Sequence, residues 1–169
     1  MRKVYKVFLD TSALIPLIEE SHPNHKSVRR YLCEGKKTYC MDTVVLSEYL
    51  TGISPEKQES TKNSLVQQFP VYSFSQNGAL IGARLFKHLC EKNNVPKTDS
   101  GKQILRVDIF ILASAIENQA DIILFEDKHF STMIENLQDF PKEVLSLPHC
   151  QRIQDIQIQP DFFDNDSNM

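Results

Sequence analysis

The chain has 169 residues, a mass of 19.5 kDa and a formal net charge of −3 at pH 7. This length suffices for one well-buried core and is too short for two independent domains. With 41% hydrophobic and 24% charged residues, the composition is that of an ordinary globular protein, and no apolar run is long enough to cross a bilayer. We therefore expect one compact cytoplasmic domain with no membrane association.

The remaining global features exclude two further classes. The sequence pI near 5.9 excludes a strongly basic nucleic-acid-binding surface, so any binding of nucleic acid requires a local patch or a cation. The four cysteines stand singly and form no zinc-finger pattern, so we expect reduced thiols.

The first half of the chain alternates strands with helices. Residues 4–9 predict an apolar strand that ends at Asp10, and Thr11 or Ser12 can cap the helix that follows. The next expected elements are a helix over 24–33, a short strand over 38–41, a helix capped by Thr43 that ends at Gly52, and a helix from Pro55 to about residue 69.

The second half continues the alternation. Residues 71–74 predict a third strand, and apolar residues at spacings of three and four predict a helix over 76–93. A polar loop should follow over 93–103, and then a helix over 107–116 that is buried on several sides and carries Asp108 in its first turn. Residues 121–125 predict the clearest strand, with a short helix after it.

Strands that alternate with helices favour parallel pairing through right-handed crossovers. We therefore expect a three-layer α/β/α sandwich with a mostly parallel central sheet over residues 1–147. Residues 148–169 are expected to form a C-terminal extension that ends in a partly flexible acidic tail. In such folds, ligands bind beyond the carboxyl ends of the strands.

Four acidic residues lie in strongly apolar surroundings. Asp10 and Asp127 each follow a predicted strand, Glu48 lies inside an apolar helix, and Asp108 begins a buried one. Each has an ordinary explanation when taken alone. Asp10 and Asp108 could cap helices, Glu48 could face outward or pair with a lysine, and Asp127 could begin a turn.

Taken together, the four acids predict a metal site. Clustered carboxylates repel one another, increasingly so as water is excluded, and such a cluster normally persists around cations. Ligation by oxygen alone suits Mg²⁺ or Mn²⁺ better than zinc. Two such ions can activate a water and stabilise the leaving oxygen of a phosphodiester.

At these positions, over roughly residues 4–140, the sequence resembles the PIN (PilT N-terminal) domain nucleases, including toxin ribonucleases of the VapC type. A first strand runs into Asp10-Thr11-Ser12, and a helical acid, Glu48, lies in TVVLSEYL. Asp108 opens DIFILASA, which fits Asp-x-x-Ile-x-Ala-x-Ala, and Asp127 opens Asp-x-x-Phe after a strand. Four motifs in this order are more specific than any single acid.

The resemblance implies Mg²⁺- or Mn²⁺-dependent cleavage of RNA, whether single-stranded or structured. Asp10, Glu48, Asp108 and Asp127 would be both the catalytic and the metal-binding residues. Ser12 would be an auxiliary residue that hydrogen-bonds a metal ligand or water. The resemblance further implies a homodimer and an antitoxin protein as a possible partner, whose basic residue could replace the metal among the acids.

Two alternatives remain open at this stage. A PIN-fold module could bind RNA or protein without cutting it, since the family often places Thr or Ser two residues before the last acid, where this chain has Phe125. An aspartate-based phosphatase could use Asp10 as nucleophile. That chemistry usually requires a second acid two residues later, where this chain has Ser12.

Overall fold

The fold is built on one sheet of five parallel strands, in the spatial order β3-β2-β1-β4-β5, in a computed structural model that describes residues 3–156. The strands are β1 (Tyr5–Leu9), β2 (Lys37–Asp42), β3 (Val71–Tyr72), β4 (Ile122–Phe125) and β5 (His149–Arg152). The helices are α1 (Thr11–Ile18), α2 (His25–Cys33), α3 (Thr43–Thr51), α4 (Pro55–Gln68), α5 (Gln76–Glu91), α6 (Asp99–Glu117) and α7 (Lys128–Asn136), with a 3-10 turn η1 (Ile153–Asp155) after β5.

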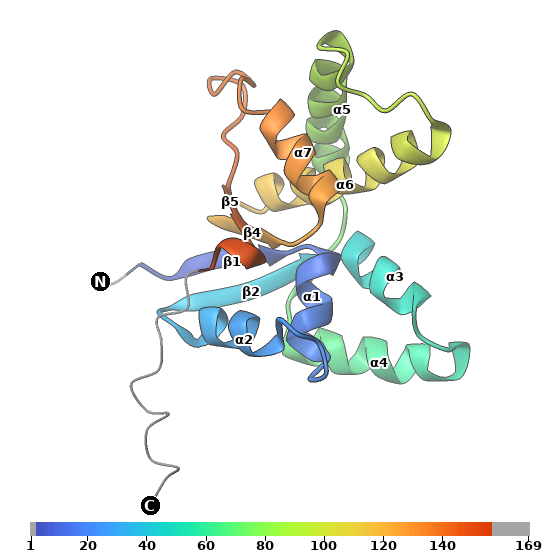
Figure 1. The fold of residues 1–169 in the computed structure, drawn as a ribbon, viewed down its shortest axis with the longest axis vertical. Helices are drawn as coiled ribbons and strands as arrows, with labels where there is room; N and C mark the ends of the chain where they lie inside the picture. Colours follow the sequence, from blue (N-terminus) through green and yellow to red (C-terminus); the bar gives the residue numbers. More distant parts are fainter. Residues whose placement is uncertain (1–2, 157–169) are drawn as a thin grey trace, which may run out of the picture.

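The helices cover both faces of the sheet. In Figure 1, α5, α6 and α7 lie above the sheet, α1, α2 and α4 lie below it, and α3 lies beside the carboxyl ends of the strands. The predicted three-layer α/β/α sandwich is therefore confirmed. Within residues 3–156, no helix has the length and apolar character that a bilayer span requires.

The apolar runs of the sequence become the middle of this sandwich. In β1, Val7, Phe8 and Leu9 are fully buried, and Ile123 and Leu124 of the adjacent β4 are equally so. A central parallel strand has helices on both faces, which is why these strands are continuously apolar and do not alternate. Helix α6 is buried over much of its circumference, as its composition predicts.

The predicted start of the helix that carries Asp108 is wrong. The polar stretch read as a loop over 93–103 ends earlier, because α6 begins at Asp99. Thr98 caps it through a hydrogen bond from the Gly101 amide to the Thr98 hydroxyl, and Asp99 in the first turn suits the positive end of the helix. Asp108 consequently lies in the middle of α6, which excludes the helix-cap explanation for this acid.

Asp10 caps α1, which confirms the capping explanation for this acid and excludes Thr11 and Ser12 as the cap. The predicted cap of α3 is wrong by one residue, because Asp42 takes the place of Thr43. In both cases a strand passes into a helix without a loop, so the last buried residue of the strand region supplies the cap. These two carboxyls are thereby fixed at the carboxyl edge of the sheet.

The residues directly after position 147 enter the sheet. His149–Arg152 forms β5, which pairs in parallel with β4, and Ile153 behind it is buried in the core. The sequence predicts an extension from residue 148 and no strand there, because HCQR lacks an apolar pattern. The predicted acidic tail, residues 161–169, lies outside the described residues.

The position of β5 predicts how the chain responds to truncation. A chain that ends at residue 147 loses the pairing of β5 with β4 and the burial of Ile153, and it exposes an apolar strand edge. We expect its free energy of unfolding to be lower, by about 3 kcal/mol or more, than that of a chain ending at residue 156. Urea denaturation of the two truncated chains measures this difference, and equal midpoints would show that β5 adds no stability.

Candidate metal centre

The candidate site lies where the order of the strands changes direction. The chain proceeds from β1 outward to β2 and β3 on one side, and then returns to β4 and β5 on the other. Asp10 follows β1 and Asp127 follows β4, and these strands are neighbours in the sheet. The backbone amide of Asp10 donates to the Leu124 carbonyl at 3.0 Å, which ties the two strand ends together. Such a change of direction forms a crevice at the carboxyl edge.

Asp10 is the most deeply buried of the four acids. Only 5% of its surface is exposed, and burial raises the pKa of its carboxyl to about 6 although hydrogen bonds from Ser12 act to lower it. Its Oδ2 accepts the Ser12 amide at 3.0 Å and the Ser12 hydroxyl at 2.5 Å. Capping and site formation are therefore compatible at this residue.

The Ser12 hydroxyl links the two strand ends. It donates to Asp10 and accepts the backbone amides of Glu126 at 2.8 Å and Asp127 at 3.2 Å. One side chain of α1 thus holds both the first acid and the backbone that carries the last acid. The predicted hydrogen bond from Ser12 to a candidate metal ligand is present.

Thr11 has a comparable role that the sequence analysis missed. Its hydroxyl donates to Oε2 of Glu48 at 2.5 Å, although 37 positions separate the two residues. Glu48 lies on the exposed side of α3, and this bond draws it toward the start of α1. The Asp-Thr-Ser sequence therefore supplies one acid and two hydroxyls that orient other acids.

Asp108 approaches the same region from α6. Its Oδ2 is buried and has no hydrogen-bond partner among the described residues. Burial, and then the charges of Asp10, Asp127 and Glu48, raise the pKa of its carboxyl to about 8. None of the groups that shift this pKa is cationic, so the described protein offers Asp108 no compensating charge.

Asp127 occupies the beginning of α7. Its Oδ1 accepts the backbone amides of His129 at 2.5 Å and Phe130 at 3.1 Å. The side chain is exposed to solvent and still influences Asp108 electrostatically. As with Asp10, a helix cap holds the carboxyl in place at the end of a strand.

The four acids therefore share one electrostatic region, and each comes from a different element or its cap. Among the described residues, no three acidic, histidine or cysteine side chains surround a single point as metal ligands would. The candidate metal-ligand atoms are all carboxylate oxygens, and one of them, on Asp108, is buried and has no hydrogen-bond partner among the described residues. This set fits a hard divalent cation such as Mg²⁺ or Mn²⁺ better than a transition metal that prefers nitrogen or sulfur.

Asp42 is a further acid at this edge, and the sequence analysis missed it. It is fully buried, and its Oδ1 accepts the amides of Val44 and Val45 at the start of α3. Burial raises the pKa of its carboxyl, and the amides of Val45 and Val44 act to lower it. Asp42 thus fixes the start of the helix that carries Glu48.

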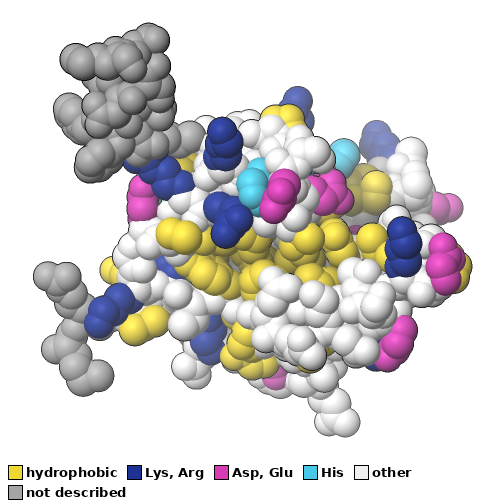
Figure 2. All heavy atoms as spheres, turned by 90° about the horizontal axis from the view of Figure 1, so that it is seen from below, with side chains coloured by type: hydrophobic (Ala, Val, Ile, Leu, Met, Phe, Trp, Pro, Cys, Tyr) yellow, Lys and Arg dark blue, Asp and Glu magenta, His cyan; other side chains and the backbone are white. Residues whose placement is uncertain are grey.

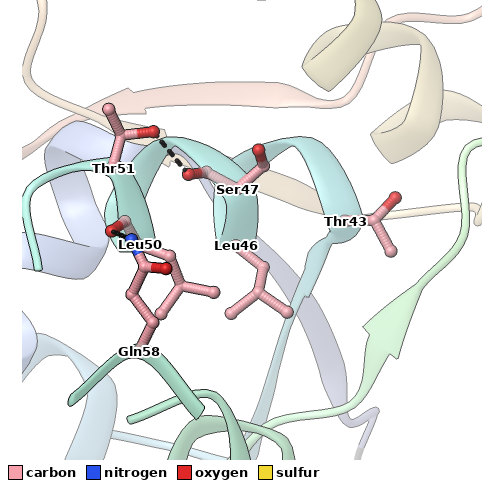
Figure 3. Close-up of a pocket in the computed structure, with 6 residues that line it drawn as sticks. All are labelled: Thr43, Leu46, Ser47, Leu50, Thr51 and Gln58. Carbon is pink, nitrogen blue, oxygen red and sulfur yellow. Dashed lines mark hydrogen bonds between the residues drawn. The ribbon is translucent and has the colours of Figure 1, made fainter. Parts of the chain in front are cut away.

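A separate hollow of about 380 Å³ between α3 and α4 offers no acid–base or metal-binding chemistry. Figure 3 shows Gln58 of α4 reaching toward the α3 backbone, where its amide donates to the Leu50 carbonyl at 3.0 Å. The other residues that line it are Thr43, Leu46, Ser47 and Thr51. Because none of these side chains titrates near neutral pH, this hollow is not the candidate site.

Comparison with known families identifies the fold. Residues 7–135 match the family model of the PIN domain, and this span contains all four acids. Among curated protein sequences there is no match.

Solved structures of similar fold include complexes from bacterial toxin–antitoxin systems. The chain is similar to VapBC-1 of nontypeable Haemophilus influenzae, with a TM-score of 0.59 and 14% identity over 88% of this chain and 98% of that one. It is similar to VapBC2 of Rickettsia felis, bound to a promoter DNA fragment, with a TM-score of 0.57 and 14% identity over 87% and 98%. It is also similar to Mycobacterium tuberculosis VapC20, described as a sarcin-ricin loop cleaving toxin, with a TM-score of 0.53 and 15% identity over 74% and 92%.

The raised pKa values predict how stability depends on pH when no metal is bound. Unfolded aspartate titrates near pH 3.9, whereas the pKa is about 6 for Asp10 and about 8 for Asp108 in the folded protein. Between about pH 4 and pH 8 the folded state therefore binds more protons than the unfolded state, and the free energy of unfolding falls as the pH rises. Denaturation with urea in the presence of a chelator, repeated across this range, measures the slope.

The same argument predicts the effect of Asp108→Asn. A neutral amide cannot ionise, so at pH 8 the variant should exceed the parent in free energy of unfolding by about 2 kcal/mol, after allowance for the partial exposure of the site. Its dependence on pH should be weaker. Asp99→Asn is the matched control, because this aspartate lies on the same helix with 97% of its side chain exposed. If Asp108→Asn keeps the full slope of the parent, Asp108 is not the group responsible.

Removal of the Ser12 hydroxyl should lower the stability of the site. Ser12→Ala removes one donor to Asp10 and leaves the amides of Glu126 and Asp127 without their acceptor. We expect a loss of about 1–3 kcal/mol in the free energy of unfolding. Amide hydrogen exchange at residues 126 and 127 should accelerate with it. Unchanged exchange at these two amides would contradict the proposed link between the strand ends.

Proposed function

This chain belongs to the PIN domain family, and we propose that it is a divalent-metal-dependent endoribonuclease. The observation that carries the proposal is the carboxyl of Asp108. Its buried oxygen has no partner among the described residues, and three further carboxylates act on it without a cationic side chain to offset them. A divalent cation would relieve the repulsion among the four acids.

Asp10, Glu48, Asp108 and Asp127 would hold one or two Mg²⁺ or Mn²⁺ ions. When bound, the cation supplies positive charge opposite the scissile phosphate and makes a water molecule easier to deprotonate. The hydroxyls of Thr11 and Ser12 would orient Glu48 and Asp10, so that the ligand oxygens are held before the cation arrives. A cation would also allow this acidic protein to approach the phosphates of RNA.

A module that binds RNA or protein without cutting it is the second candidate function, and one observation favours it. Phe125, at the position where the family often has a hydroxyl, is 2% exposed and packs against Phe130 with ring centroids 4.8 Å apart. It can give no hydrogen bond to the site. A pure binder would show no carboxylate-dependent Mn²⁺ site and no cleavage of single-stranded RNA.

We further propose that the chain is the toxin of a toxin–antitoxin pair. The VapBC structures of similar fold are complexes of two proteins, which supports a protein partner here. Figure 2 shows a hollowed band of hydrophobic side chains, bordered by charged ones, on the face that lies at the bottom of Figure 1. An antitoxin could cover this apolar band and insert a basic side chain among the acids. We also propose a homodimer and a cytoplasmic location.

Replacement of Asp10 tests the nuclease proposal. Asp10→Asn keeps the cap of α1, because an amide oxygen can accept the same bonds from Ser12, but it removes a charged ligand. We expect Mn²⁺-dependent cleavage of single-stranded RNA to fall by roughly 100-fold or more. Calorimetric titration with Mn²⁺ should show a matching loss of affinity.

Asp99→Asn again provides the control, with unchanged cleavage and Mn²⁺ binding expected. Undiminished turnover by purified Asp10→Asn would contradict the assignment of this acid. If the parent shows no Mn²⁺ binding that depends on these acids and cuts no RNA, the binding module is the better description.

A further inference from the structure

A second cavity opens directly beside the candidate metal centre. It has a volume of about 270 Å³ and lies between α7 and the segment of residues 94–105 that leads into and begins α6. Asp108 lies in its wall, and so does His129, two residues after Asp127. We propose that this cavity binds one unstacked base of the RNA chain and thereby sets the sequence at which the chain is cut, an inference that rests on the proposed nuclease function.

The lining of the cavity combines apolar side chains with neutral polar groups. Ile104, Leu105 and Met133 supply apolar contacts, and the side-chain amides of Asn94 and Asn136 lie at the same cavity. Ile104 is 46% exposed, so part of its side chain is accessible to a ligand from solvent. A nucleobase has the same character, with an apolar face and an edge of hydrogen-bond donors and acceptors.

The two side-chain amides of the cavity are available for a ligand. No hydrogen bond joins the side-chain amide of Asn94 or Asn136 to another described residue. Each amide carries both a donor and an acceptor, which is the combination that reads the edge of a base. The imidazole of His129 adds a ring on which a base can stack.

The charge of the cavity does not suit the phosphate of a nucleotide. No lysine or arginine lines it, and its one acidic residue is Asp108. A phosphate in this cavity would find no basic side chain to pair with, whereas a neutral base meets amides, hydroxyls and aliphatic carbons. The volume is also below the roughly 300–1,000 Å³ of sites for drug-sized ligands, which suits a single ring system.

The shared wall links the cavity to the reaction. Asp108 lines the cavity, and its carboxyl interacts with Asp10, Glu48 and Asp127. A base seated in the cavity would therefore belong to a nucleotide adjacent to the phosphate that faces the cation of the proposed metal site. Correct seating would bring that phosphate to the metal site, so base identity would affect the rate of cleavage.

Binding of nucleosides tests the cavity without cleavage. The probes are adenosine, guanosine, cytidine and uridine, in the presence of a chelator, with the methyl resonances of Ile104, Leu105 and Met133 followed by NMR. We expect at least one nucleoside to shift these signals in the parent chain. Thr132→Trp should fill the cavity from α7, and Asn136→Leu should replace an amide by an apolar group with the same branching; each should weaken the binding about tenfold.

Ser60→Trp is the matched control. Ser60 is an exposed helical residue whose hydroxyl donates to a carbonyl of the preceding turn, as the hydroxyl of Thr132 does. It lies on α4, below the sheet in Figure 1, whereas α7 lies above it. This control should bind nucleosides as the parent does. Thermal unfolding of each variant establishes that it is folded.

Sequencing of the products from a random pool of single-stranded RNA gives the second measurement. The parent should prefer one base at a fixed position next to the cut, and Thr132→Trp and Asn136→Leu should reduce that preference about tenfold while Ser60→Trp keeps it. The proposal is overturned if no nucleoside shifts the cavity methyls, or if both cavity variants retain the cleavage profile of the parent. Nucleoside binding without any cleavage would support the base site and reject the nuclease proposal alone.

Discussion

The structure depends on one electrostatic constraint, the repulsion among carboxyl groups gathered at the change of direction in the sheet. The effect on the pKa is large for Asp108, because its carboxyl is buried and also interacts with the charges of three other acids. In the absence of a cationic side chain, proton uptake or a divalent cation can relieve the repulsion. The candidate activity and the predicted pH dependence of stability are thus two consequences of the same arrangement.

The local backbone, more than the packing of side chains, holds these acids in place. Asp10 and Asp127 are fixed because each begins a helix at the end of a strand, and Asp42 does the same for the helix that carries Glu48. The hydroxyl of Ser12 then couples the ends of β1 and β4 through three hydrogen bonds. Carboxyls held in this way keep their positions at little cost in side-chain entropy.

The departure from the family pattern at Phe125 has a structural counterpart. Its ring fills the core against Phe130, where a hydroxyl would leave a polar group among apolar side chains. The amides of Glu126 and Asp127, which follow it, receive their acceptor from Ser12. The end of β4 is therefore held from the start of α1 and does not require a hydroxyl of its own.

The amino-acid sequence alone determined most of the strands and helices along the chain, the parallel sandwich and the placement of Asp10 and Asp127 after strands, because strand burial and helix capping are largely local. Only the tertiary structure decided the rest. It put Asp108 in the middle of α6, brought Thr11 to Glu48, made HCQR a strand and opened a cavity beside the acids. The last three of these features join segments far apart in the chain, and no local pattern of residues encodes such contacts. The early start of α6 depends on the local cap at Thr98, inside a stretch whose polar composition favours a loop.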